Sequence, residues 1–138
     1  LLTDPALVAH LSGRTRSRMA AEPDLAGAIL ESFVGMEIVK QLGWATTRAT
    51  LFWFRTQTGH EVDFVLEADD GRLVGVEVKA STAVRDSDFQ GLRTLAKVAG
   101  KRFFRGILLY TGRESLPFGK GLEAVPMPAL WLSGSASA

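Results

Sequence analysis

The chain has 138 residues, of which 46% are hydrophobic and 22% charged, enough for one domain with a sizeable core. It has no cysteine, which excludes disulfides, thiol catalysis and thiolate metal sites. Neither a signal peptide nor a run of about 18 apolar residues is present. We therefore expect a soluble, cytoplasmic domain without membrane contact, in which oxygen ligands or His10 and His60 would hold any metal.

Charge is unevenly distributed along the chain, although the formal net charge is only +1. Residues 60–90 hold eight acidic and three basic residues, a balance of −5, whereas residues 91–120 hold seven basic residues and one acidic residue, a balance of +6. An acidic centre beside a basic segment fits a metal site with a phosphate-binding rim. A solvated surface explains the same pattern equally well.

Residues 1–23 predict a short helix, capped by Asp4 with Pro5 in its first turn, and a basic connector from Ser12 to Pro23. The helix predicted next, Asp24–Leu42, is capped by Asp24 and closed by Gly43. It carries two apolar stripes: Leu25, Ile29, Phe33 and Met36, and Leu30, Val34, Ile38 and Leu42.

Glu31 lies beside the second of these stripes. Burying a carboxylate there requires a cation or hydrogen-bond donors. The alternative is a glutamate at the margin of the apolar face that reaches solvent.

Three strands follow, at residues 51–55, 60–67 and 73–79, and the turn Asp69-Asp70-Gly71 predicts a hairpin between the last two. Alternation places Val62, Phe64 and Leu66 on one face and Glu61, Asp63 and Val65 on the other. The strands predict a three-stranded antiparallel meander.

A second helix is predicted after Ser81, with a capping box between Ser87 and Gln90 and an end at Gly100. Its buried stripe comprises Phe89, Leu92, Leu95, Ala96 and Ala99. The strand Phe104–Tyr110 then implies a right-handed crossover to a parallel partner. Residues 122–125 predict a short edge strand, and residues 133–138 a disordered tail.

The hairpin brings together Asp63 on one strand and Glu77 and Lys79 on the next. Two carboxylates and the carbonyl of Val78 suit Mg²⁺ or Mn²⁺, which hydrolyses phosphodiesters by activating water and neutralising phosphate charge. Lys79 would orient the water or stabilise the developing charge. Alternatively, these residues form ordinary ion pairs on the wet face of a sheet, and His60 is a turn residue instead of a ligand.

This order of elements, with Asp63 and Glu77-Val78-Lys79, resembles the PD-(D/E)xK phosphodiesterase superfamily and its restriction-endonuclease-like core. The resemblance implies an α/β fold of order α-β-β-β-α-β, with a mixed central sheet flanked by helices, over residues 24–132. It also implies that Glu31 joins the metal site and that Gln90 supports it. Val62 stands where the name of the superfamily has proline.

A second resemblance covers almost the whole chain: it is similar to a domain of unknown function that follows an AAA-type P-loop ATPase in many prokaryotic proteins. The segments that carry it are Asp4–Leu7, Leu30–Val34 with Glu37, Gly59–Val65, Val76–Ser81, Asp88–Leu92, Gly106–Gly112 and Leu116–Gly119. It implies that the chain is the C-terminal part of a larger ATPase. No ATP site is expected here, because Gly119-Lys120-Gly121 lacks the spacing of a P-loop.

Two functions remain open. The first is a metal-dependent nuclease, or a nuclease-derived module that binds nucleic acid, with DNA favoured and with Arg102, Arg105 and Arg113 as a phosphate-binding rim. The second is a catalytically inactive accessory domain that holds the ATPase, a partner protein or a homo-oligomer.

Overall fold

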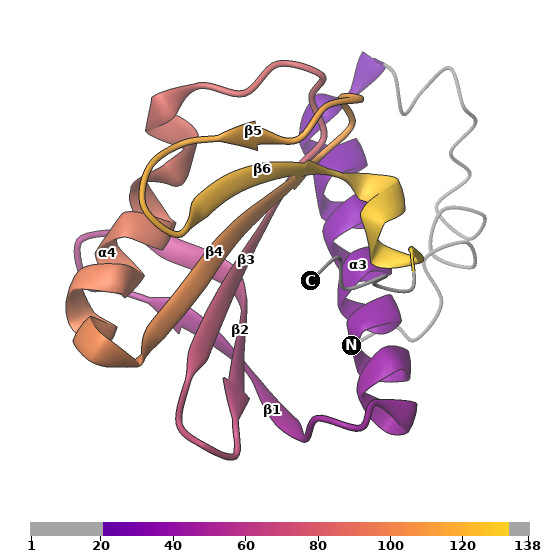
Figure 1. The fold of residues 1–138 in the computed structure, drawn as a ribbon. Helices are drawn as coiled ribbons and strands as arrows, with labels where there is room; N and C mark the ends of the chain where they lie inside the picture. Colours follow the sequence, from indigo (N-terminus) through magenta and orange to yellow (C-terminus); the bar gives the residue numbers. More distant parts are fainter. Residues whose placement is uncertain (1–20, 133–138) are drawn as a thin grey trace.

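A six-stranded mixed sheet lies between two helices in the computed structural model, which describes residues 21–132 (Figure 1). Helix α3 (Pro23–Trp44) covers one face and helix α4 (Gln90–Ala99) the other. The strands are β1 (Ala49–Arg55), β2 (Glu61–Ala68), β3 (Leu73–Lys79), β4 (Phe103–Tyr110), β5 (Leu116–Pro117) and β6 (Leu122–Pro126). Three 3₁₀ turns occupy Asp86–Phe89, Gly100–Arg102 and Met127–Leu130.

The order of helices and strands confirms the predicted α/β succession. No helix in residues 21–132 is long and apolar enough to cross a membrane. The predicted N-terminal helix, most of the basic connector and the predicted tail fall in residues 1–20 and 133–138, outside the described residues.

The strands are arranged in the order β1-β2-β3-β4-β6-β5. The first three form the predicted antiparallel meander, and β4 is parallel to β3, as the crossover through α4 requires. The prediction that residues 122–125 form an edge strand is wrong, because β6 lies between β4 and β5. Gly119 and Gly121 both have positive φ and form the turn that folds β5 back onto β6.

Helix α3 is longer than predicted and ends differently at both termini. It begins at Pro23, so Asp24 lies in the first turn and does not cap it. Gly43 lies inside the last turn without a positive φ, and the chain leaves the helix through extended Ala45. The stripe predicted to include Val34 and Ile38 packs on the sheet with Phe64, Leu66 and Val76, whereas Leu25, Ile29, Phe33 and Met36 are only partly covered.

A β-bulge in β2 overturns the predicted alternation of that strand. Phe52 pairs with Val65 and Phe54 with Val62, so Asp63 and Phe64 together face the single residue Trp53. The extra residue turns Val62 to the α4 face, where it packs with Val65, while Phe64 remains on the α3 face. The bulge therefore falls at Asp63, the first of the predicted site residues.

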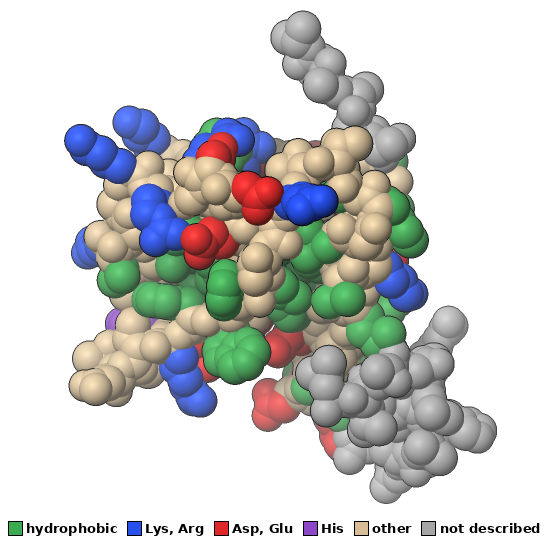
Figure 2. All heavy atoms as spheres, turned by 90° about the horizontal axis from the view of Figure 1, so that it is seen from below, with side chains coloured by type: hydrophobic (Ala, Val, Ile, Leu, Met, Phe, Trp, Pro, Cys, Tyr) green, Lys and Arg blue, Asp and Glu red, His purple; other side chains and the backbone are tan. Residues whose placement is uncertain are grey.

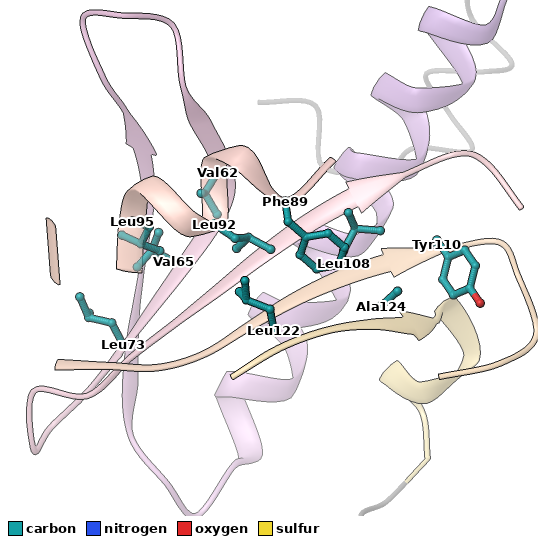
Figure 3. Packing of buried hydrophobic residues seen from close by; sticks show 10 residues of the cluster. All are labelled: Val62, Val65, Leu73, Phe89, Leu92, Leu95, Leu108, Tyr110, Leu122 and Ala124. Atoms are coloured by element: carbon teal, nitrogen blue, oxygen red, sulfur yellow. The ribbon is translucent and has the colours of Figure 1, made fainter. Parts of the chain in front are cut away.

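The α4 face holds the larger group of buried side chains (Figure 3). Phe89, Leu92 and Leu95 are buried, which confirms that part of the predicted stripe, and Gly100 ends the helix with a φ of 57°. The predicted capping box between Ser87 and Gln90 is wrong. The 3₁₀ turn precedes the helix, and Asp88 accepts the hydrogen bond from the Arg85 backbone N–H at 2.6 Å.

Glycine allows α4 to approach β2 closely. A Cβ at Gly91 would lie 2.0 Å from the backbone oxygen of Glu61, a distance that no side chain can occupy. This contact brings the first turn of α4 against the first residue of β2, and it places Gln90 beside the end of β3.

We expect Gly91→Ala to destabilise the fold by about 1–3 kcal/mol, because the methyl group forces α4 away from the sheet. Gly43→Ala is the matched control, since its Cβ meets nothing within 4 Å and alanine stabilises a helix interior by about 0.5–1 kcal/mol. Urea denaturation measures both. Equal stability of the Gly91→Ala variant and the wild type would contradict the close approach.

Candidate functional site

The β2–β3 ladder ends where the predicted site begins. Its last paired residues are Phe64 and Val76, and continuing the register would put Asp63 opposite Glu77. Instead, the Asp63 carboxylate accepts a hydrogen bond from the backbone N–H of Val78 at 2.7 Å. Because the N–H and C=O of a strand residue point to the same edge, the carbonyl of Val78 also faces the β2 side.

Glu77 is partly buried and lies on the α4 face of β3. Its Oε2 is the buried side-chain oxygen that lacks a hydrogen-bond partner among residues 21–132. Burial, and next the charge of Asp63, raise the pKa of Glu77 to about 8. The backbone N–H of Asp63 acts in the opposite direction and lowers this pKa, but Oε2 has no donor. A buried carboxylate oxygen without a donor is costly, and a proton or a cation at Oε2 would relieve this cost.

Burial also raises the pKa of Asp63, to about 6, against the lowering effect of the hydrogen bond from Val78. The charges of Glu31 and Glu61 act in the same direction as burial. Asp63 and Glu77 therefore belong to one cluster of acidic side chains, which has too few hydrogen-bond donors to compensate its charge.

Lys79 lies on the same face of β3 as Glu77, but its ammonium forms an ion pair with Asp88. Most of this pair is shielded from solvent, since only 30% of the Lys79 side chain and 19% of the Asp88 side chain are exposed. The site thus contains an ammonium whose partner lies on the turn before α4.

Glu31 is an exposed residue of α3, as the alternative of a glutamate at the margin of the apolar face predicted, but it lies near enough to the hairpin for its charge to raise the pKa of Asp63. One turn further along this helix, a Cβ at Gly35 would lie 2.9 Å from the Phe64 ring, so the helix contacts the residue next to Asp63. Partial burial, and next the charge of Glu61, raise the pKa of Glu31. Nevertheless, Glu31, Asp63 and Glu77 do not form a three-ligand metal group, since no such group of His, Asp or Glu occurs in the described part of the chain.

A polar cleft of about 290 Å³ opens beside Glu77, Lys79 and Gln90. Gln90, the first residue of α4, is exposed at its edge. His60 lines the cleft too, and its backbone is held in the turn by Thr56, as the turn alternative predicted. A role of its imidazole as a metal ligand stays a prediction.

Two of the three predicted rim arginines lie away from this cleft. Arg105 is in register with Val74 near the start of β3 and is paired with Glu123, and Arg102 is paired with Glu67. Figure 2 views the end of the sheet at which β3 begins, where basic and acidic side chains are intermixed around a band of hydrophobic ones. Arg113 follows β4, whose last residue Tyr110 is in register with Lys79, and so lies toward the cleft end.

Asp88 and Glu61 are the residues that the sequence reasoning missed. Asp88 pairs with Lys79 through the tertiary fold, and no spacing within the sequence links the two. Glu61 lines the cleft and raises the pKa of Glu31, Asp63 and Glu77. The signal that could have indicated Glu61 was its position two residues before Asp63, on the strand face that the alternation assigned to both residues.

Comparison with protein families gives a match over residues 26–130 to the family described as Domain of unknown function (DUF4143). The chain belongs to this family. The matched range of DUF4143 includes α4, the whole hairpin and nearly all of α3, so every residue of the cleft lies within it. A comparison with curated proteins gives no match.

A solved structure of similar fold is a chain in an assembly of Thermococcus gammatolerans McrB AAA+ hexamers with bound McrC. The TM-score is 0.52 at 9% identity, with 72% of this DUF4143 chain and 27% of that chain covered. At this identity the similarity concerns the fold alone. The present chain spans only about a quarter of its neighbour's length.

The titration of Glu77 should make the metal-free protein less stable as pH rises. Since the pKa is about 4.5 in the unfolded chain and about 8 in the native state, the native state holds an extra proton between these values, and its stability falls through this window. Between about pH 6.5 and 8.5, above the titration of Asp63, we expect the wild type to lose at least about 1 kcal/mol.

Glu77→Gln removes the ionisable group, so this variant should keep its stability over the same range. Urea denaturation in the presence of a chelator measures the difference. The charges that face Glu77 (Glu31, Glu61, Asp63 and the Lys79–Asp88 pair) are identical in both proteins. If the free energy of unfolding changes with pH in the same way in the wild type and in Glu77→Gln, Glu77 is not the group whose titration lowers the stability.

Proposed function

We propose that residues 24–132 form a divalent-metal-dependent, nuclease-like domain of the PD-(D/E)xK type, with a restriction-endonuclease-like core, that acts on nucleic acid. The observation that carries this proposal is the buried Glu77 Oε2 without a hydrogen-bond partner, next to the Asp63 carboxylate. Ordinary ion pairing on a wet sheet face does not account for it, because the single ammonium of β3 is paired elsewhere.

Asp63, Glu77 and the carbonyl of Val78 are the protein groups that would hold Mg²⁺ or Mn²⁺. They fit a hard cation because all are oxygen donors at the point where the two strands part, and the Oε2 of Glu77 lacks a hydrogen-bond partner among residues 21–132. Glu31 lies outside this set and would act through its charge or through water. When bound, the metal supplies an activated water at neutral pH and stabilises charge on the phosphate.

The remaining residues of the cleft orient the substrate. The Lys79 ammonium is a positive charge held at the cleft by Asp88, suited to a phosphate oxygen or to the attacking water. Gln90 offers an amide at the cleft edge, where it can donate to a phosphate oxygen and accept from a water.

Nucleic acid is the substrate class that this arrangement favours, because phosphodiesters are the anions to which a metal, an ammonium and an amide are jointly complementary. Arg113 and Arg85, the latter in the loop between β3 and α4, are basic side chains toward the cleft end, whereas Arg55 at the same end is already paired with Glu61. They replace Arg102 and Arg105 as the phosphate-binding rim in this proposal.

The domain would work together with a P-loop ATPase of the AAA type. Two observations support this: the resemblance to domains that follow such ATPases, and the AAA+ assembly that contains the neighbour of similar fold. The 138 residues contain no P-loop of their own, and the resemblance implies that the ATPase is another part of the same protein. Assembly into a homo-oligomer would follow from that ATPase.

Titration calorimetry with Mn²⁺ tests the metal site. We expect binding to the wild type and a loss of at least about tenfold in affinity, or about 1.4 kcal/mol, in Asp63→Asn and in Glu77→Gln. The asparagine can still accept the Val78 N–H, so the variant separates charge from folding. Asp86→Asn is the control, since 78% of that side chain is exposed and it pairs with Arg93 outside the site.

If the wild type takes up no Mn²⁺, the metal site is refuted and the accessory-domain function takes its place. If Mn²⁺ binds, plasmid cleavage in the presence of Mg²⁺ or Mn²⁺ tests turnover. Lys79→Met should then abolish cleavage while it leaves Mn²⁺ bound.

Binding of a short DNA duplex, measured by fluorescence anisotropy at low salt, tests the rim. Arg113→Ala and Arg85→Ala should each weaken binding severalfold and reduce its salt dependence, because each removes a phosphate contact. Arg105→Ala is the matched control, because Glu123 already neutralises that guanidinium. Equal losses at Arg105 and Arg113 would contradict the assignment of the rim to the cleft end.

A further inference from the structure

The ion pair between Lys79 and Asp88 joins the end of β3 to the turn before α4. Lys79 has other potential partners, since Glu77 lies on the same strand face and its Oε2 lacks a hydrogen bond. The ammonium nevertheless lies at Asp88. The structure thus keeps the positive charge away from two carboxylates that would attract it.

Asp88 is well anchored for this task. Its carboxylate accepts the Arg85 N–H at 2.6 Å, and its own N–H donates to the Arg85 carbonyl at 3.0 Å. The next residue, Phe89, is fully buried and stacks on Phe118 with ring centroids 4.5 Å apart. These contacts fix the backbone at Asp88 and Phe89, so the Asp88 carboxylate has a defined position. The flexible Lys79 side chain therefore extends to Asp88 to form the ion pair.

Asp88 also stays ionised. Partial burial would raise its pKa, but the hydrogen bonds from Lys79 and from the Arg85 N–H outweigh this and lower it. Its negative charge is therefore present at neutral pH, where it pairs with the Lys79 ammonium.

We propose that Asp88 is a positioning residue: it holds the Lys79 ammonium off Asp63 and Glu77, which leaves these carboxylates open to a divalent cation. This inference rests on the proposed metal site but assigns a residue outside it. Without Asp88, the ammonium pairs with Glu77 and competes with the metal for the same oxygen atoms.

Calorimetric titration with Mn²⁺ tests the competition. Asp88→Asn should lower Mn²⁺ affinity by about tenfold, and the double variant Asp88→Asn with Lys79→Met should regain the affinity of Lys79→Met alone. The regain decides the question, because a purely structural role of Asp88 would persist without the lysine. Asp86→Asn, on the same 3₁₀ turn, should bind Mn²⁺ like the wild type.

Nuclear magnetic resonance of the ¹⁵N-labelled Lys79 amine provides a readout without metal. We expect its Nζ signal to shift in Asp88→Asn and to shift again when Glu77→Gln is added, since the ammonium changes partner twice. Glu77→Gln alone should leave the signal in place. An unchanged signal in Asp88→Asn would overturn the proposal.

The outcomes separate the two proposals. A wild type that binds no Mn²⁺ refutes the metal site, while the amine signal still tells which carboxylate holds Lys79. Mn²⁺ binding that is equal in the wild type and in Asp88→Asn refutes the positioning role alone. A loss in Asp88→Asn that Lys79→Met does not restore assigns the effect to folding, and it also refutes the positioning role.

Discussion

The hydrogen bond from the Val78 N–H to the Asp63 carboxylate occupies the place where the β2–β3 ladder would have continued. A side chain there keeps the strands apart at their ends, whereas a backbone pair would have closed them. The bulge at Asp63 and Phe64 makes this possible, because it shifts the aspartate out of the regular alternation. The parting of the strands leaves the Glu77 Oε2 without a hydrogen-bond partner among residues 21–132, although the Asp63 backbone N–H still lowers the pKa of this carboxyl group. The chemistry of the site depends on this one interrupted ladder.

The fold removes most of the charge segregation seen along the chain. Arg93 and Arg102, from the basic segment, pair with Asp86 and Glu67 of the acidic one. Arg105 pairs with Glu123. What remains is local: the charges of Asp63, Glu61 and Glu31 raise the pKa of Glu77, Glu61 is paired with Arg55, and the Lys79 ammonium is engaged by Asp88. A local excess of negative charge that survives such pairing is a better indicator of a cation site than the charge balance of a sequence window.

Local patterns were sufficient to predict the meander, the crossover through α4 and the approach of Asp63 to the end of β3, because a short turn and a strand–helix–strand succession determine them. They were insufficient wherever two distant segments decide the outcome. The bulge depends on how Trp53 meets β2 across the ladder, and the partner of Lys79 depends on where the turn before α4 is anchored. The assignment of Arg105 to the rim did not take the direction of β4 into account. Because β4 is parallel to β3, Arg105 lies near the start of β3, whereas Glu77 lies near its end.

Packing and electrostatics are coupled through α4. The close approach at Gly91 fixes the first turn of this helix on Glu61, and the buried Phe89 fixes the preceding 3₁₀ turn on the sheet. Asp88 directly precedes Phe89 in this turn, and its carboxylate also accepts the Arg85 N–H, so its position is tied to the core. Lys79 has a flexible four-carbon stem, and only a rigid partner gives its charge a definite position. The α4 packing that stabilises the fold therefore also determines which carboxylates at the end of β3 stay free to bind a cation.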